Sequence, residues 1–214
     1  MSAVPDWLHT LVESARGLTT ADLSPVGPPA ADRARRSAVL ILFGEAALGP
    51  DLVLIERAHS LRSHAGQVAF PGGAADGDES AVQTALREAR EEIGLDPAGV
   101  QVLGELPPLG LPRSRFAVTG VLAWWRTESP IGVADHKEVA AVLRVPLSEL
   151  ADPQRRVTVA HPAGYRGPGF LLGELLLWGF TANIVDRLLS IAGLHQPWDA
   201  DRTVPAPAVV RVSQ

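Results

Sequence analysis

Three glutamates, Glu88, Glu91 and Glu92, are the residues whose type and spacing point most directly to chemistry. They occupy positions i, i+3 and i+4 of a segment with helical periodicity, so their side chains would share one helix face. Each like-charged pair at this spacing destabilises an isolated helix by about 0.2–0.5 kcal/mol. Carboxylates beside a glycine-rich loop are ligands that Mg²⁺ and Mn²⁺ prefer. The spacing therefore indicates a divalent metal site. The alternative is a solvated acidic face that Arg87 and Arg90 partly neutralise.

A helix predicted over residues 80–93 must position these glutamates. Val82, Leu86 and Ala89 form part of its apolar stripe, and Gly94 is typical of a helix C-terminus. Before this helix, a strand-like segment at 67–70 ends in Pro-Gly-Gly. Mixed strands with long helices indicate an α/β sandwich rather than a doubly wound parallel sheet. The other predicted strands are 37–43, 51–57, 100–106, 116–126, 138–145, 156–160 and 170–172, and the other predicted helices are 5–18 and 178–194.

The length of 214 residues predicts one main domain. We expect a helix and an irregular arm packed on it over 1–36, the domain itself over 37–194, and an extended tail over 195–214.

The absence of cysteine excludes disulfides and thiolate metal sites and fits a reducing, cytoplasmic location. The net charge of −5 argues against a nucleic-acid partner, and no apolar run reaches membrane-spanning length. The oligomeric state is not fixed by the sequence, which is compatible with a homodimer.

The wider spacing around the glutamates forms a longer motif. It reads Gly73, five residues, Glu79, seven residues, Arg87-Glu88-Ala89, one residue, Glu91-Glu92, one residue, Gly94-Leu95. This resembles the Nudix box of the Nudix hydrolases, G-x5-E-x7-R-E-U-x-E-E-x-G-U, where U is a bulky apolar residue. Every charged or glycine position matches, and Ala89 departs from the pattern only in being small. Such a match is far more specific than a lone glycine-rich loop.

The resemblance implies a Nudix-type α/β/α sandwich with a mixed sheet and a loop–helix–loop that binds metal and diphosphate. Its carboxylates, Glu88, Glu91 and Glu92, would ligate Mg²⁺ or Mn²⁺ and serve in catalysis together with Arg87. The backbone carbonyl of Gly72 would add a metal ligand.

Other residues of the box would have structural roles. Glu79 would pair with Arg87 and hold the loop against the helix, and Gly94 would end the helix. Gly73 would shape the loop and lie beside the substrate. Outside the box, Glu138 at the start of a predicted strand is a further candidate metal ligand or water-activating group. The alternative for Glu138 is a charge on an edge strand.

A second motif lies upstream, in LVLIERAHSLRSHAGQVAFPGG (52–73). It resembles the pattern L-L-T-x-R-S/A-x3-R-x3-G-x3-F-P-G-G of coenzyme A pyrophosphatases, with Arg57 and Arg62 in place and Ile55 where the pattern has Thr. Two guanidiniums suit coenzyme A, which carries a diphosphate and a ribose 3′-phosphate. The alternative is that both arginines form surface ion pairs with Glu56 or Asp51. At the substrate Ile55 would weaken or alter recognition, whereas in the core it would be harmless.

Together the two motifs imply divalent-metal-dependent hydrolysis of the diphosphate bond of coenzyme A or its thioesters. The products would be 3′,5′-ADP and 4′-phosphopantetheine or its acyl form. The expected partner is this small molecule, with no nucleic acid and no membrane. Two alternatives stay open. The same chemistry would serve another nucleoside diphosphate derivative, such as an oxidised dNTP, ADP-ribose or a dinucleotide. A non-catalytic Nudix module would bind its ligand without hydrolysis.

Overall fold

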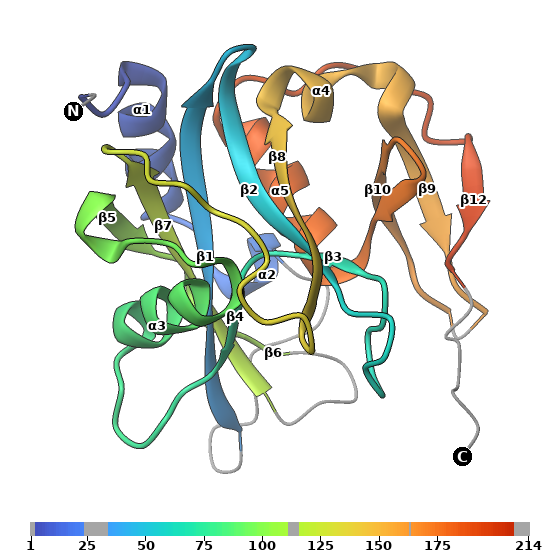
Figure 1. Cartoon of the computed structure of the whole chain (residues 1–214). Coiled ribbons are helices and arrows are strands. Elements are labelled where there is room, and N and C mark those ends of the chain that lie inside the picture. Colours follow the sequence, from blue (N-terminus) through green and yellow to red (C-terminus); the bar gives the residue numbers. More distant parts are fainter. Residues whose placement is uncertain (1–2, 24–33, 111–115, 163, 208–214) are drawn as a thin grey trace.

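The computed structural model describes residues 3–23, 34–110, 116–162 and 164–207 (Figure 1). Its strands are β1 (Arg35–Ala46), β2 (Gly49–Arg57), β3 (Val68–Ala69), β4 (Gly72–Ala74), β5 (Val100–Glu105), β6 (Leu109–Gly110), β7 (Phe116–Trp125), β8 (Val139–Pro146), β9 (Arg156–Ala160), β10 (Arg166–Leu172), β11 (Leu175–Leu177) and β12 (Thr203–Pro205). Its α-helices are α1 (Asp6–Ala15), α2 (Thr20–Leu23), α3 (Ala81–Ile93), α4 (Leu147–Ala151) and α5 (Gly179–Ile191), and 3₁₀ turns occupy Pro97–Gly99 and Pro153–Arg155.

The main sheet is mixed and has eight strands. Its central order is β3-β2-β1-β7-β5, with β8 paired to β2, β4 to β1 and β6 to β7. β1 and β7 run parallel, whereas β1 and β2 form an antiparallel hairpin. This mixed pairing is the sheet that the sequence predicts for an α/β sandwich.

β1 and β2 are paired near their turn and then separate to form a fork, and the short strands β3 and β4 lie inside it. β1 pairs with β2 over Phe43–Ala46 but with β4 over Ser37–Val39. β2 in turn pairs with β3 through Ile55 and Glu56. Because β7 and β8 occupy the outer sides of β1 and β2, the short strands β3 and β4 lie between them. The fork thereby brings β4 into contact with α3.

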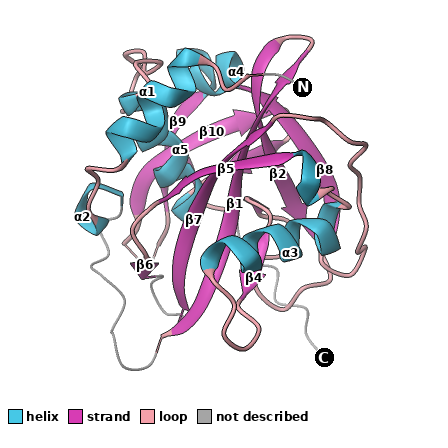
Figure 2. Cartoon of the chain, turned by 90° about the vertical axis from the view of Figure 1, so that its left-hand side faces the viewer, coloured by secondary structure: helices cyan, strands magenta, loops and turns pink. Residues whose placement is uncertain are grey.

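Helices cover both faces of the main sheet. α1 and α5 pack on one face and α3 on the other, and Figure 2 shows β1 and β7 between α1 and α3. Alternate residues of β2 serve the two cores because successive strand side chains point to opposite faces. Leu52 and Leu54 belong to the α5 side, and Val53 and Ile55 to the α3 side. The prediction of an α/β/α sandwich is confirmed.

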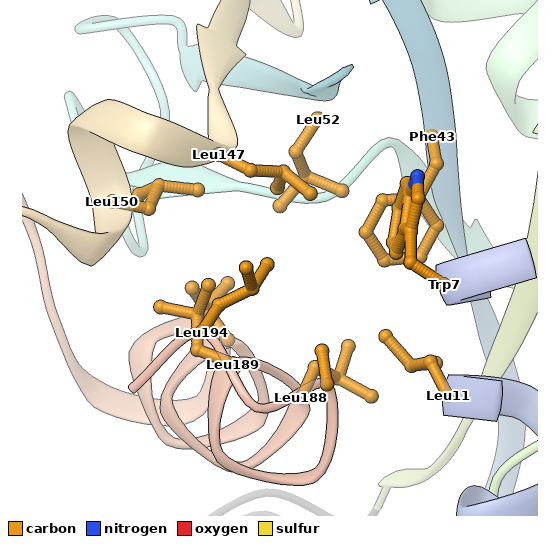
Figure 3. A pocket seen from close by; sticks show the side chains of 11 residues that line it. Trp7, Leu11, Phe43, Leu52, Leu147, Leu150, Leu188, Leu189 and Leu194 are labelled. Carbon is orange, nitrogen blue, oxygen red and sulfur yellow. The ribbon is translucent and has the colours of Figure 1, made fainter. Parts of the chain in front are cut away.

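Both cores are closely filled. Trp124 and Trp125 are adjacent on β7, and each is buried in a different core. On the α5 side, Trp7, Leu11 and Leu188 are among the side chains that converge on a cavity of about 10 Å³ (Figure 3). A void of that size with an apolar lining stays dry and holds no ligand. This face of the sheet therefore has a structural role.

A second sheet, with the order β11-β10-β9-β12, stands beside the main one. The segment expected as an extended tail supplies β12, which runs parallel to β9. The Arg156 Cζ lies 4.4 Å from the Phe170 ring centroid and 4.8 Å from that of Trp198, and its guanidinium pairs with Asp186. Residues 195–207 are thus tied to the fold. Residues 24–33 of the expected arm and 208–214 of the tail lie outside the described residues, and the domain boundaries stay predictions.

Within the described ranges, no helix combines the length and the apolar character that crossing a membrane would require.

Candidate active site

The helix that carries the three glutamates has defined ends. Ser80 caps its N-terminus, where the Ser80 hydroxyl accepts from Gln83 N–H at 3.2 Å and the Gln83 side chain accepts from Ser80 N–H at 2.9 Å. This capping box is readable in the sequence as Ser-x-x-Gln. At the other end Gly94 has φ 69°, a left-handed conformation that glycine adopts without steric cost. Both ends of α3 are thereby fixed.

A bidentate ion pair holds the loop before α3 against the helix. Arg87 Nε donates to Glu79 Oε1 at 2.8 Å, and Arg87 Nη2 donates to Glu79 Oε2 and to the Ala74 carbonyl, each at 3.0 Å. These hydrogen bonds from Arg87 are the main reason why the pKa of Glu79 falls to about 2. Glu79 is thus engaged with Arg87 and the loop, as expected from the resemblance.

The same arginine also neutralises two of the three glutamates. Arg87 Nη1 lies 2.9 Å from Glu88 Oε1 and 3.0 Å from Glu91 Oε2. Glu88 is largely buried, with 15% of its side chain exposed, whereas 58% of the Glu91 side chain is exposed. One guanidinium therefore compensates part of the repulsion that the helical spacing creates.

Glu92 is the most confined of these carboxylates. The residue is 2% exposed, and its Oε2 accepts from Gly72 N–H at 2.8 Å. Its Oε1 is buried and has no hydrogen-bond partner among the described residues. Burial, assisted by the charges of Glu88 and Glu138, raises the pKa of Glu92 to about 8, although the Gly72 N–H and Arg57 act in the opposite direction. A buried carboxylate with an unsatisfied oxygen requires either a proton or a cation.

Glu88 and Glu138 share this acidic environment. Burial is the main cause that raises the pKa of Glu88, and the charge of Glu138 also contributes. Glu138 is exposed immediately before β8, and its backbone carbonyl accepts from Ala58 N–H at 2.8 Å. The structure thus brings Glu88, Glu92 and Glu138 into electrostatic contact and directs Glu91 toward Arg87.

Two glycines allow the chain to pass close to these carboxylates. A Cβ on Gly73 would lie 2.5 Å from the Glu88 carboxyl carbon, and a Cβ on Gly72 would lie 2.3 Å from the Ala38 carbonyl oxygen. The Ser37 hydroxyl donates to the Gly73 carbonyl at 2.5 Å and fixes β4 to β1. Sequence reasoning missed Ser37, for which the motif carries no signal. The role of the Gly72 carbonyl as a metal ligand stays a prediction.

The donor set fits a hard divalent cation, but the described residues contain no group of three or more His, Cys, Asp and Glu side chains already arranged around a metal position. Glu88 and Glu91 are engaged by Arg87, which accounts for this. The fit rests instead on the unsatisfied Glu92 Oε1 and on the mutual repulsion of Glu88, Glu92 and Glu138. Oxygen-only ligands of this kind suit Mg²⁺ or Mn²⁺.

The two arginines of the upstream motif have different surroundings. Arg57 acts on the charge of Glu92, and its Nε is buried without a hydrogen-bond partner among the described residues. Arg62 lines a cavity of about 220 Å³ that is bounded by the segment between β2 and β3. Among the described residues neither arginine forms an ion pair with Glu56 or Asp51; Glu56 contacts His59 at 2.8 Å, and Asp51 pairs with Arg144.

The departure from the upstream motif at Ile55 is explained by burial. Ile55 is 0% exposed and belongs to the core beneath α3. Its side chain therefore does not reach the substrate side, and the replacement of Thr removes no hydroxyl from the site. Ala89 is likewise 0% exposed in the same core.

Comparisons with known proteins agree with this geometry. A family model described as "NUDIX domain" matches residues 33–163. A Pectobacterium atrosepticum protein named "Uncharacterized Nudix hydrolase NudL" is 41% identical over 143 residues, 65% of this chain and 73% of that protein. A Yersinia pestis protein of the same name is 39% identical over 158 residues, 72% of this chain and 78% of that one. The crystal structure of a Nudix hydrolase from M. smegmatis, RenU, matches with a TM-score of 0.54 at 21% identity over 78% of this chain and 90% of that one, which shows the shared fold.

Nudix hydrolases generally use divalent metal ions and act on nucleoside diphosphate derivatives. The matched family model and the relatives, together with the complete box on α3 and its preceding loop, show that this chain belongs to the Nudix hydrolase family.

Proposed function

We propose that this Nudix hydrolase uses Mg²⁺ or Mn²⁺ to hydrolyse the diphosphate bond of coenzyme A or its thioesters. The products are 3′,5′-ADP and 4′-phosphopantetheine or its acyl form. The observation that carries the proposed chemistry is the buried Glu92 carboxylate, whose Oε1 has no hydrogen-bond partner in the described part of the chain and which lies near two further acids. The site occupies the Glu88–Glu92–Glu138 cluster at the N-terminal side of β4.

Each residue of the site has a distinct task in this proposal. Glu88, Glu92 and Glu138 hold the metal, and Glu91 joins them when it leaves Arg87. A bound divalent ion neutralises diphosphate charge and lowers the pKa of a bound water. One of the three box glutamates accepts the proton of the attacking water as the phosphorus–oxygen bond of the diphosphate breaks.

The residues around the carboxylates preserve their geometry. Arg87 and Glu79 fix the loop, and the absence of side chains at Gly72 and Gly73 lets β4 lie against β1 and against the Glu88 carboxylate. Arg57, which faces Glu92, is placed to contact the diphosphate once metal has compensated the carboxylates. Preorganised charges of this kind lower the barrier because they need little rearrangement during the reaction.

The choice of coenzyme A rests on the upstream motif and on two structural points. Ile55, the departure that most favoured another substrate, is buried in the core. Arg57 and Arg62 are free of the surface ion pairs that would have occupied them, within the part of the chain that the structure describes. Both guanidiniums therefore remain available for substrate phosphates.

Wild-type protein is expected to release 3′,5′-ADP from coenzyme A in the presence of Mg²⁺ or Mn²⁺, and none in the presence of a chelator. Dephospho-coenzyme A should be poorer by at least about tenfold in kcat/KM, because it lacks a phosphate that forms charge-assisted hydrogen bonds. Chromatography of products from a panel with acetyl-coenzyme A, ADP-ribose, NADH and 8-oxo-dGTP checks this. Preference for one of the last three compounds would contradict the coenzyme A assignment while keeping the family chemistry.

Replacing Glu91 or Glu92 by Gln should lower kcat by about 10²-fold or more, because the substitution removes a negative charge needed for metal and proton transfer. The Glu13→Gln variant on the exposed face of α1 is the matched control and should retain wild-type rates. Urea denaturation of each variant checks that folding is preserved. Full activity in a well-folded Glu92→Gln protein would disprove the role assigned to the cluster.

The raised pKa of Glu92 also predicts a pH dependence of stability in the presence of a chelator. The folded protein holds this proton more tightly than the unfolded chain, so the stabilisation is complete below the unfolded value and is lost as the pH rises through the folded value, about 8. Glu92→Gln cannot titrate. Urea midpoints should therefore show the variant gaining stability relative to wild type between about pH 5 and pH 8. A constant difference across that range would refute the expectation.

A further inference from the structure

The cavity beside Arg62 is a feature that the diphosphate chemistry does not use. It has a volume of about 220 Å³ and lies between the loop joining β2 to β3 and the strand β11 of the small sheet. In Figure 1 this loop is the teal segment below the β3 label, on the side of the molecule that carries β9 and β10. One wall is polar and comes from the loop, and the other is apolar and comes from β11 and the residue after it. Their main residues are Arg62, His64 and Gln67, and Leu175, Leu176 and Trp178.

The loop that forms the polar wall is held closed at its base. Arg57 N–H donates to the Gln67 carbonyl and Gly66 N–H donates to the Arg57 carbonyl, each at 3.0 Å. His59 Nε2 lies 2.8 Å from Glu56 Oε1, and a Cβ on Gly66 would lie 3.0 Å from the His59 ring. Gly66 has φ 67°, a left-handed conformation that glycine adopts without steric cost, and the His59 ring packs closely against it. These contacts hold the loop in the shape that turns Arg62 toward the cavity.

At the loop wall the Arg62 guanidinium is the group suited to an anion, and two acids, Glu56 and Glu174, also line the cavity. Glu56 is engaged by His59, and Arg62 forms no ion pair within the described ranges. Glu174 and Arg62 both line the cavity and are both exposed to solvent, which screens the two charges alike. An Arg62 guanidinium with free donors is suited to bind a phosphate through two hydrogen bonds.

The opposite wall favours a flat, largely apolar group. Leu175 and Leu176 are half-buried, and the Trp178 ring is held by stacking with His161 at 6.2 Å between centroids. A wall of this kind matches the face of a flat aromatic ring. The cavity volume is below the roughly 300–1,000 Å³ of pockets that enclose whole drug-sized ligands, so it takes one portion of a larger molecule.

We propose that this cavity is the subsite for a 3′-phosphorylated nucleoside, with the purine ring against Leu175, Leu176 and Trp178 and the 3′-phosphate at Arg62. The inference rests on the proposed function, because it divides the phosphates of coenzyme A between the two arginines. Arg57 serves the diphosphate beside the acidic cluster, and Arg62 serves the 3′-phosphate. The small sheet then decides which diphosphate compounds are selected, while α3 and β4 carry out the chemistry.

Calorimetric titration in the presence of a chelator tests the subsite without catalysis. Wild-type protein should bind 3′,5′-ADP more tightly than 5′-AMP. The Arg62→Gln variant should bind 3′,5′-ADP at least about tenfold more weakly and 5′-AMP within about twofold of wild type, because only the 3′-phosphate contact is lost. Leu176→Ala should weaken binding of both nucleotides. Arg16→Gln, an exposed change on the C-terminal side of α1, should affect neither.

Equal binding of 3′,5′-ADP and 5′-AMP by the wild type, or unchanged binding by Arg62→Gln, would overturn the subsite. So would loss of 4′-phosphopantetheine binding in Leu176→Ala with 3′,5′-ADP binding retained, because the cavity would then hold the other arm. Hydrolysis of coenzyme A by the wild type is measured alongside. If coenzyme A is hydrolysed while the binding pattern fails, only the subsite is wrong. If coenzyme A is not hydrolysed, the proposed function itself fails.

Discussion

The burial of the Glu92 carboxylate is the constraint on which the rest of the site depends. A carboxylate that is 2% exposed, with one oxygen bound to Gly72 N–H and the other unsatisfied, is costly to keep charged. The carboxylate is confined by two features of the fold. β1 and β2 separate so that β4 contacts α3, and the Glu79–Arg87 ion pair holds the loop before α3 in place. These features place a set of acids where a divalent cation would relieve their repulsion.

In the proposed function, chemistry and selectivity come from different parts of the chain. The acidic cluster belongs to α3 and the adjoining strands of the main sheet, whereas the larger cavity is completed by β11 of the second sheet and by Trp178, which follows it. The family match ends at residue 163, before β10 and β11 begin. The catalytic box and the cavity wall formed by β11 and Trp178 are separate parts of the chain. A change in that wall can therefore alter the substrate while the reaction at the box is kept, because function depends on the site rather than on the fold.

The sequence predicted the local features well, because they depend on short spacing. The helix at 80–93, its glycine stop and the Glu79–Arg87 proximity all follow from residues within two turns or one loop of each other. Long-range pairing was not predictable in the same way. β4 and β12 are three-residue strands whose partners, β1 and β9, lie far away in the sequence, so periodicity carries no signal for them. The electrostatic contact of Glu138 with Glu92 likewise required the folded chain, and so did the burial of Ile55 in the core beneath α3.

Binding of Mn²⁺, followed by electron paramagnetic resonance of the free ion, tests the central claim most directly. The account predicts saturable binding by the wild-type protein and an affinity at least about tenfold lower for Glu92→Gln, because the buried carboxylate supplies charge and a ligand oxygen. Equal Mn²⁺ affinity in the two proteins, with both folded, would contradict the conclusion that the confined Glu92 carboxylate is built to hold a metal.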